Sequence, residues 1–340
     1  MDVATLQQQL KKNPPAPVYL VLGTQQALQK QAKVAFNKLI PTEEQVMNVG
    51  NYDMEVTPVA TAIDDAVSAP FFGEHRLVMI NKPYFLTSQH VNVKVDHDVN
   101  ELSNYLKAPE PTTILVLFAP YEKLDSRKGV VKLLKKTAVL VDASPLKEVA
   151  ARKAVQGLFQ NQGVQIEPDA MDELVRRCNA DYGRMSASVK QLALLSYPEK
   201  RVTAAMVSGL VKQSLDNNVF HLVNAVLRRN QKEALGRYQQ LLAAQTAPLA
   251  INGALINQFR LLTQIKILAQ RGLSQGSIAA KLRVHPYRVK LGLQTVRHFK
   301  METLTNGYLG LVDCDRQLKS SQRSPELLFQ LFMLKLSHQT

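Results

Sequence analysis

Apolar runs alternate with helical stretches through residues 1–143, and this alternation constrains the fold more than any other feature of the chain. Strands are predicted at residues 18–22, 46–52, 76–80, 113–118 and 138–142. Helices are predicted between them, at residues 25–39, 58–67, 101–107 and 128–136. The polar, valine-rich stretch 88–100 is expected to be an irregular connection. Strands that alternate with helices in this way indicate a parallel α/β sheet with covered faces.

The first predicted strand ends at Gly23 and leads into a helix, as in a phosphate-binding loop. That loop needs the pattern G-x-x-x-x-G-K-[ST]. Here Leu28 replaces the second glycine, and Gln31 follows Lys30 where a hydroxyl would hold Mg²⁺. After the predicted strand 76–80, Asn81-Lys82 stands where an acidic pair would bind the metal. The sequence therefore predicts an NTPase-type scaffold without hydrolysis, with no catalytic residue and no cofactor.

Strand signals end near residue 144, and helix signals replace them. Ser144 is predicted as a helix N-cap with Pro145 at the first helical position. Helices are then predicted at residues 145–162, 168–179, 183–196 and 203–213, with 164–166 as a link. We therefore predict three domains: an α/β domain at 1–143, a small helical domain at 144–215 and a larger helical domain at 216–340.

The last predicted domain combines a buried helix with a strong positive charge. Residues 252–271 carry apolar side chains almost all round the predicted helix, so it is buried on several sides, in a large bundle or between subunits. The whole chain has a formal net charge of +14. Residues 216–340 have a net charge of +11, whereas the positive and negative charges of residues 1–143 cancel. This asymmetry favours contact with a polyanion, nucleic acid above all, over a merely soluble basic surface.

The chain carries no signal for a membrane, a leader or a metal. It has no run of 18 uninterrupted apolar residues, and the first six residues lack the pattern of a signal peptide. Cys178 and Cys314 lie far apart and in no C-x-x-C pair, which is typical of a cytoplasmic protein. The histidines show no metal-ligand spacing, and His97 between two aspartates is expected to be solvated. We expect neither a metal site nor a membrane partner.

Residues 275–289 have the spacing of a helix-turn-helix. Ser274 is predicted as the first N-cap, although 272–276 also matches the G-x-S-x-G hydrolase pattern, which needs a preceding strand. A small core of Ile278, Leu282 and Val289 is expected beneath the pair. As a recognition helix, the second helix would expose Tyr287, Arg288, Lys290 and Gln294. An ordinary helical hairpin inside a bundle explains the same residues equally well.

Residues 68–73, Ser-Ala-Pro-Phe-Phe-Gly, form the other unusual segment. Phe71 and Phe72 are adjacent on a tight turn between Pro70 and Gly73, so both cannot easily point into the core. One or both are expected to be exposed and to anchor a partner that offers an apolar pocket. The alternative is that the pair covers the bottom of the domain core.

Several segments together resemble one known family. They are residues 17–23, 69–78, 123–128, 258–262 and 285–290. In their order and spacing, the chain resembles the delta subunits of bacterial DNA polymerase III clamp loaders over essentially its full length. This resemblance implies an AAA+-like domain at 1–143 without a working ATP site, a helical lid domain at 144–215 and a helical collar domain at 216–340.

The resemblance also implies a function and a site. Phe71 and Phe72 would insert into a hydrophobic cleft of the ring-shaped sliding clamp (beta), with Ser68, Ala69 and Pro70 shaping the turn. Such a contact favours the opened ring, which is then loaded onto primer–template DNA during chromosomal replication. The chain itself would do no chemistry, although its holoenzyme is a DNA-directed DNA polymerase, a nucleotidyltransferase.

The implied partners are the sliding clamp, the clamp-loader ATPase subunits (tau/gamma), delta prime and primer–template DNA without sequence preference. From charge and position, the residues expected near DNA are Tyr287, Arg288, Lys290 and Arg297. The expected location is the cytoplasm, at replication forks on the nucleoid. Two alternatives stay open at this point: a helix-turn-helix DNA-binding regulator, which would be a dimer that prefers certain duplex sequences, and an NTPase, which is the weaker of the two.

Overall fold

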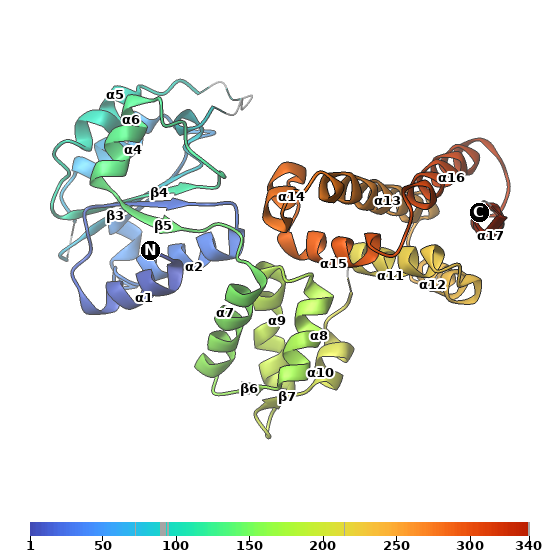
Figure 1. Ribbon diagram of the computed structural model, residues 1–340. Helices are drawn as coiled ribbons and strands as arrows, with labels where there is room; N and C mark the ends of the chain where they lie inside the picture. The colour runs from blue at the N-terminus through green and yellow to red at the C-terminus, as the bar shows by residue number, and fades with distance from the viewer. Residues whose placement is uncertain (72, 89–92, 94, 214, 339–340) are drawn as a thin grey trace. The chain divides into compact units, whose positions relative to one another are not determined.

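The computed structural model describes residues 1–71, 73–88, 93, 95–213 and 215–338. The chain divides into two compact units, Met1–Leu146 and Lys147–Thr340 (Figure 1). Among the described residues, no helix is both long and apolar enough to cross a bilayer.

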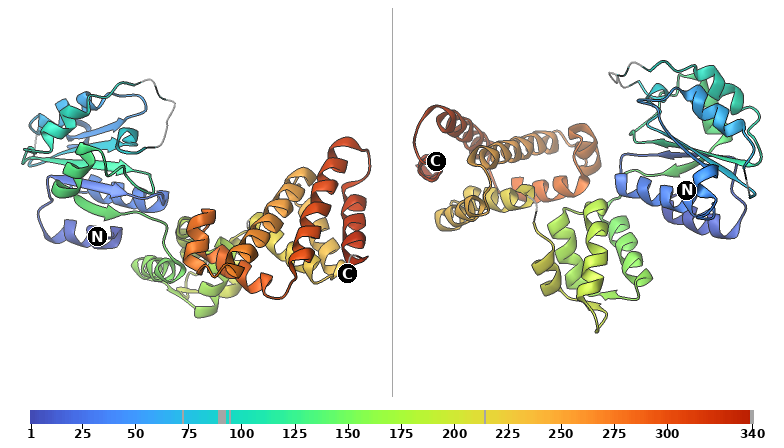
Figure 2. Two further views of the ribbon diagram at one scale, coloured as in Figure 1. Left: turned by 45° about the horizontal axis from the view of Figure 1, so that its top comes forward. Right: turned by 180° about the vertical axis from the view of Figure 1, so that it is seen from behind.

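The first unit is built on a five-stranded parallel sheet with the strand order β2-β3-β4-β1-β5. The strands are β1 (Val18–Leu22), β2 (Val49–Asp53), β3 (Arg76–Asn81), β4 (Thr113–Ala119) and β5 (Val139–Asp142). The central strand β4 is buried at every position, since helices cover both faces. Figures 1 and 2 show α1 and α2 on one face and α4, α5 and α6 on the other. The predicted parallel α/β fold of this domain is confirmed.

The helices of this unit largely follow the predicted ranges. They are α1 (Val3–Lys12), α2 (Gln26–Asn37), α3 (Gln45–Asn48), α4 (Val59–Val67), α5 (Val99–Tyr105) and α6 (Gly129–Thr137), with a 3-10 turn at Tyr84–Leu86. Helix α1 was not predicted, because only Val3 and Leu6 of its ten residues are buried. The second strand was predicted three residues too early, because residues 45–48 form the single turn α3 before β2 begins.

The predicted solvation of His97 is wrong. The backbone N–H of Val59 donates to its Nδ1 at 3.0 Å, and its Nε2 lies 3.0 Å from the carbonyl oxygen of Met54. The ring also packs against Tyr84 and Phe85. His97 therefore ties the start of α4 to the end of β2, and burial lowers its pKa.

The first helix of the second unit begins later than predicted. Ser144 and Pro145 precede the first helix, which starts at Glu148 with Lys147 as its N-cap. The reason is that the chain still follows the sheet: the N–H of Ala143 donates to the Leu22 carbonyl at 2.8 Å. The first elements of this unit are α7 (Glu148–Asn161), β6 (Gln165–Ile166), α8 (Pro168–Cys178), α9 (Tyr182–Leu195), β7 (Arg201–Val202) and α10 (Ala204–Leu210).

The predicted link at 164–166 contains β6, which pairs in parallel with β7. The other elements of the unit are α11 (Leu215–Leu227), α12 (Gln231–Ala243), α13 (Pro248–Gln270), α14 (Gln275–Leu282), α15 (Pro286–Val296), α16 (Met301–Ser320) and α17 (Pro325–His338). The division of this unit at residue 216 stays a prediction.

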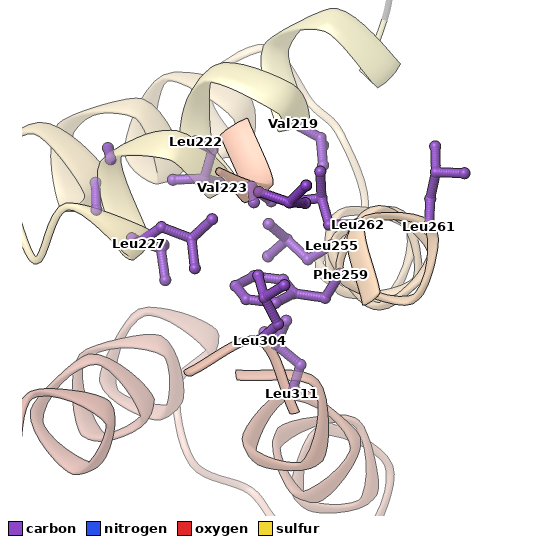
Figure 3. Close-up of a cluster of buried hydrophobic side chains, with 14 of the residues drawn as sticks. Val219, Leu222, Val223, Leu227, Leu255, Phe259, Leu261, Leu262, Leu304 and Leu311 are labelled. Carbon is purple, nitrogen blue, oxygen red and sulfur yellow. The ribbon is translucent and has the colours of Figure 1, made fainter. Parts of the chain in front are cut away.

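Helix α13 supplies the core of the helical bundle, as its all-round apolar sequence predicted. Figure 3 shows Phe259 of α13 directed toward Leu304 and Leu311 of α16. A Cβ at Gly307 would overlap the Phe259 ring, so this glycine lets α13 and α16 approach closely. Leu255 and Leu262 of α13 are fully buried beside residues of α11.

Candidate protein-binding turn

The turn between α4 and β3 exposes an aromatic side chain at the amino-terminal edge of the sheet. Helix α4 ends at Val67, and the backbone of Gly73 takes a left-handed φ of +81° before β3 begins. Phe71 is 62% exposed, so its predicted exposure is confirmed. Ser68 and Ala69 are exposed and Pro70 is partly buried. The other half of the predicted pair, Phe72, lies outside the described residues.

A buried amide holds this turn in place. The N–H of Phe71 donates to Oδ1 of Asn48 at 2.7 Å, and Asn48 is completely buried at the end of α3. Gly73 faces the carboxylate of Glu44, which precedes α3, so closely that an added Cβ would overlap it. Ser68 closes the end of α4 by donating from Oγ to the carbonyl of Asp64 at 2.9 Å. Phe71 is therefore presented on a backbone held by the body of the domain.

An ion pair anchors the base of the turn. Nε of Arg76, the first residue of β3, donates to Oδ1 of Asp65 on α4 at 2.9 Å. Tyr52 of β2 lies near the same carboxylate, and its burial together with the neighbouring Asp65 raises the pKa of its hydroxyl to about 12. The pair ties the end of α4 to the start of β3, so both sides of the turn are fixed.

The carboxyl-terminal edge of the same sheet carries the segment after Gly23 that partly resembles a phosphate-binding loop in sequence. Aligned strictly on Gly23, the lysine position falls on Gln29 and the hydroxyl position on Lys30, one residue earlier than we predicted. The Gln29 amide donates to the Gly23 carbonyl at 2.6 Å, and Leu28 is buried in the core. A Cβ at Gly23 would overlap the backbone of Ala143. The loop is therefore occupied by the domain's own groups.

A lysine lies directly after β3, where an NTPase would carry the acidic residues that bind its metal ion. Lys82, directly after β3, places its ammonium 2.9 Å from Oδ2 of Asp53 and also against Glu55. These two carboxylates raise the pKa of Lys82, so the ammonium stays charged. The two carboxylates thus neutralise a lysine. No group of three or more potential metal ligands occurs among the described residues.

The predicted helix pair at 275–289 is confirmed as α14 and α15. Ser274 accepts the N–H of Ser277 at 3.2 Å as the N-cap of α14, and Pro286 opens α15. Arg283 takes the left-handed conformation, with a φ of +54°, where a glycine is usual in the turn. Ile278 and Val289 are fully buried between the helices.

A recognition helix would expose Tyr287 and Arg288, and the structure does not agree with that interpretation. Both are partly buried, because α15 packs against α13, where Arg288 donates from Nη2 to Oε1 of Gln258 at 3.2 Å. Lys290 is exposed but lies 2.8 Å from a carboxylate oxygen of Glu148. Arg297 is exposed at the end of α15. The assignment of these four residues to DNA stays a prediction.

Sequence reasoning missed Asn48, the residue that holds the candidate turn. It sits in a stretch that was predicted as a strand, and no motif surrounds it. A polar residue directly before a short, partly exposed strand is a weak signal, and nothing in the sequence connects position 48 with position 71.

Comparison with known proteins agrees with this architecture. The family model "DNA polymerase III, delta subunit" matches residues 19–144, and the model for the C-terminal domain of the DNA polymerase III delta subunit matches residues 216–336. The chain is 34% identical to DNA polymerase III subunit delta of Bacillus subtilis (strain 168) over 328 residues, 96% of this chain and 94% of that one.

A solved structure agrees over the whole length. The chain is similar to the Bacillus subtilis DNA clamp loader delta protein with a TM-score of 0.79 and 34% identity, over 98% of this chain and 99% of that chain. The resemblance drawn from the sequence is thereby confirmed. The chain belongs to the DNA polymerase III delta subunit family, the delta subunits of the clamp loader.

Proposed function

We propose that this chain binds the sliding clamp (beta) through Phe71 and Phe72 and favours the opened ring for loading onto primer–template DNA. The observation that carries the proposal is the exposed Phe71 on a turn held by Asn48. An aromatic side chain that projects from a backbone held by the domain is suited to a pocket on a partner, since the backbone is already ordered before docking. Ser68, Ala69 and Pro70 set the path of the turn.

The mechanism is differential binding. A wedge that binds an open ring interface better than a closed one shifts the ring population by the difference of the two affinities. A difference of about 2 kcal/mol shifts the equilibrium roughly 30-fold. Reversing a population from 1:99 to 99:1 takes about 5.5 kcal/mol. The contact of Phe71 and Phe72 alone would therefore supply only part of the free energy needed to open the ring, and the tau/gamma ATPase subunits and delta prime would supply the rest.

In this proposal the chain contributes binding and the rest of the assembly contributes chemistry. Gln29 and Lys82 occupy the positions where a P-loop ATPase holds phosphate and metal, so ATP would be hydrolysed by the sister subunits. The charge of +11 in residues 216–340 would attract primer–template DNA to the collar domain through phosphate contacts without base specificity. The complex acts in the cytoplasm, at replication forks on the nucleoid.

The alternative, a sequence-specific DNA-binding regulator, has less support. A recognition helix must present its side chains to the major groove. In α15, Arg288 bonds to Gln258 of α13 and Tyr287 is partly buried. Reading DNA with this face would require α15 to leave α13, against which it is packed.

The test is calorimetry of this chain with its cognate clamp, without nucleotide or DNA. Phe71→Ala/Phe72→Ala should weaken binding by at least ~2 kcal/mol, because central aromatic anchors have effects of this size. Val34→Ala, which shortens another exposed apolar side chain of the same unit, is the matched control. If the folded wild-type chain does not bind the clamp, the proposed function is wrong. If the double variant binds as the wild type does, the clamp contact lies elsewhere on the chain.

A further inference from the structure

Helix α3 lies directly beside the candidate turn, and two contacts of the structure establish this. Asn48, its last residue, accepts the N–H of Phe71 at 2.7 Å. Glu44, its N-cap, lies against Gly73. The helix has four residues and is therefore about 6 Å long. Both ends of α3 thus touch the turn, and the residues between them lie next to it.

The two central residues of α3 are apolar and exposed. Val46 is 87% exposed and Met47 is 53% exposed. Successive helical residues point about 100° apart. Met47 therefore projects about 100° from the buried Asn48, and Val46 about 160°, so Met47 lies nearer to the turn and Val46 points outward. Val67, at the end of α4 and four residues before Phe71, is also exposed.

We propose that the clamp-binding surface consists of two segments, α3 with Val46 and Met47 and the turn with Phe71, and that Asn48 is the positioning residue that joins them. This inference rests on the proposed function, because it takes the sliding clamp as the occupant. The clamp is the occupant because the surface is continuous with the proposed Phe71 contact. We expect a partner that accepts Phe71 to reach α3 as well, because Asn48 and Glu44 place this helix against the turn.

The physical argument is that isolated exposed apolar residues are ordinary, whereas several on adjoining segments mark an interface. Val46, Met47, Val67 and Phe71 come from three segments that the fold brings together. Binding anchors are usually surrounded by contacts of smaller energy that exclude water. Phe71 would be the anchor here, and Met47 and Val46 would belong to the surrounding ring.

The first experiment places a charge on α3 and measures clamp binding by calorimetry without nucleotide. Met47→Glu should weaken binding about tenfold, and Val46→Glu should weaken it less, since a buried charge is strongly disfavoured in an apolar contact. Val56→Glu is the matched control, because Val56 is 75% exposed and follows β2 at the opposite edge of the sheet. It should bind as the wild type does.

The outcomes separate this inference from the proposed function. If Phe71→Ala/Phe72→Ala loses binding while Met47→Glu and Val46→Glu keep it, the clamp contact stands and the two-segment surface is overturned. If the phenylalanine variant keeps binding, the clamp contact lies elsewhere on the chain, and the surface proposed around Phe71 is overturned with it. Loss in both sets, with Val56→Glu unchanged, supports the two-segment surface.

The second experiment tests Asn48 by a double-mutant cycle with Phe71. Asn48→Ala should weaken clamp binding about tenfold when Phe71 is present and should have almost no further effect in the Phe71→Ala background. A purely structural role would weaken binding equally in both backgrounds, or in neither, and would overturn the positioning role. If Asn48→Ala does not fold, Asn48→Asp replaces it, because the aspartate keeps the acceptor oxygen. This variant should retain clamp binding. A folded Asn48→Asp that loses binding in both backgrounds would also overturn the positioning role.

Discussion

In the first unit, the polar groups at the carboxyl ends of the parallel strands are bonded within the domain, whereas the amino ends of the strands expose an aromatic side chain. Parallel α/β sheets usually bind ligands at the carboxyl ends of their strands. At that edge this chain places Gln29 on its own Gly23 carbonyl and Lys82 on Asp53 and Glu55. At the amino-terminal edge, Phe71 is exposed and its backbone is held by Asn48.

The comparison teaches that an inactive site is more than a set of missing residues. At the carboxyl edge, Gln29 and Lys82, which stand where phosphate and metal would bind, each have an internal partner. A change there should therefore act on stability, whereas a change at the amino-terminal edge should act on partner binding.

Gly23→Ala should destabilise the first unit by about 3 kcal/mol or more. Gly23 has a φ of +143°, and the added Cβ would overlap the backbone of Ala143 and Ser144, which cannot move without breaking the sheet. Urea denaturation followed by circular dichroism measures the loss. Gly129→Ala is the control, because nothing lies within 4 Å of its Cβ position, and it should be neutral. Equal effects of the two substitutions would contradict the packed loop.

Gly73→Ala should cost about 1 to 2 kcal/mol of stability and should also weaken clamp binding. Its φ of +81° is strained for alanine, but the overlapping group is the end of the flexible Glu44 side chain, which can move. Glu44→Ala in the same chain should relieve the clash while leaving the backbone strain. Denaturation and calorimetry together check both effects. Full recovery of stability in the double variant would show that the backbone conformation is not the cause.

Lys82→Met should destabilise the chain by at most about 1 kcal/mol at neutral pH, because the ion pairs are partly exposed. Burial raises the pKa of Asp53, but the bonds from Lys82 and from the Glu55 N–H outweigh it, so the net pKa is below 3.8. A carboxylate with a lowered pKa contributes stability above its unfolded pKa and loses it as the pH falls through the folded pKa.

The variant should therefore lose less stability than the wild type between about pH 5 and pH 2. Denaturation midpoints over this range measure the difference. The exposed Lys123→Met serves as the control. A variant whose acid sensitivity equals that of the wild type would mean that Lys82 does not hold the Asp53 pKa down.

Much of the fold could be predicted because its signals are local. The alternation of strands and helices identified all five strands of the sheet, and the all-round apolar sequence of α13 predicted its burial. Phe71 could be predicted as exposed because adjacent phenylalanines on a tight turn rarely both fit a core. Helix α1 was missed because two buried residues make a weak periodic pattern.

The remaining features depend on segments that are distant in the sequence. Nothing local indicates that Asn48 meets Phe71, that Arg288 bonds to Gln258 thirty residues away, or that the stretch after β5 passes Gly23. Ser144 looked like a helix N-cap, but the sheet holds Ala143 and delays the helix. Residue type and periodicity were enough to predict the sheet, the missing phosphate-binding residues and the exposed turn, because these signals lie within short stretches of sequence. The groups that fill the loop after Gly23 and the residue that holds the turn became visible in the folded chain, because hydrogen bonds and packing join residues that are far apart in the sequence.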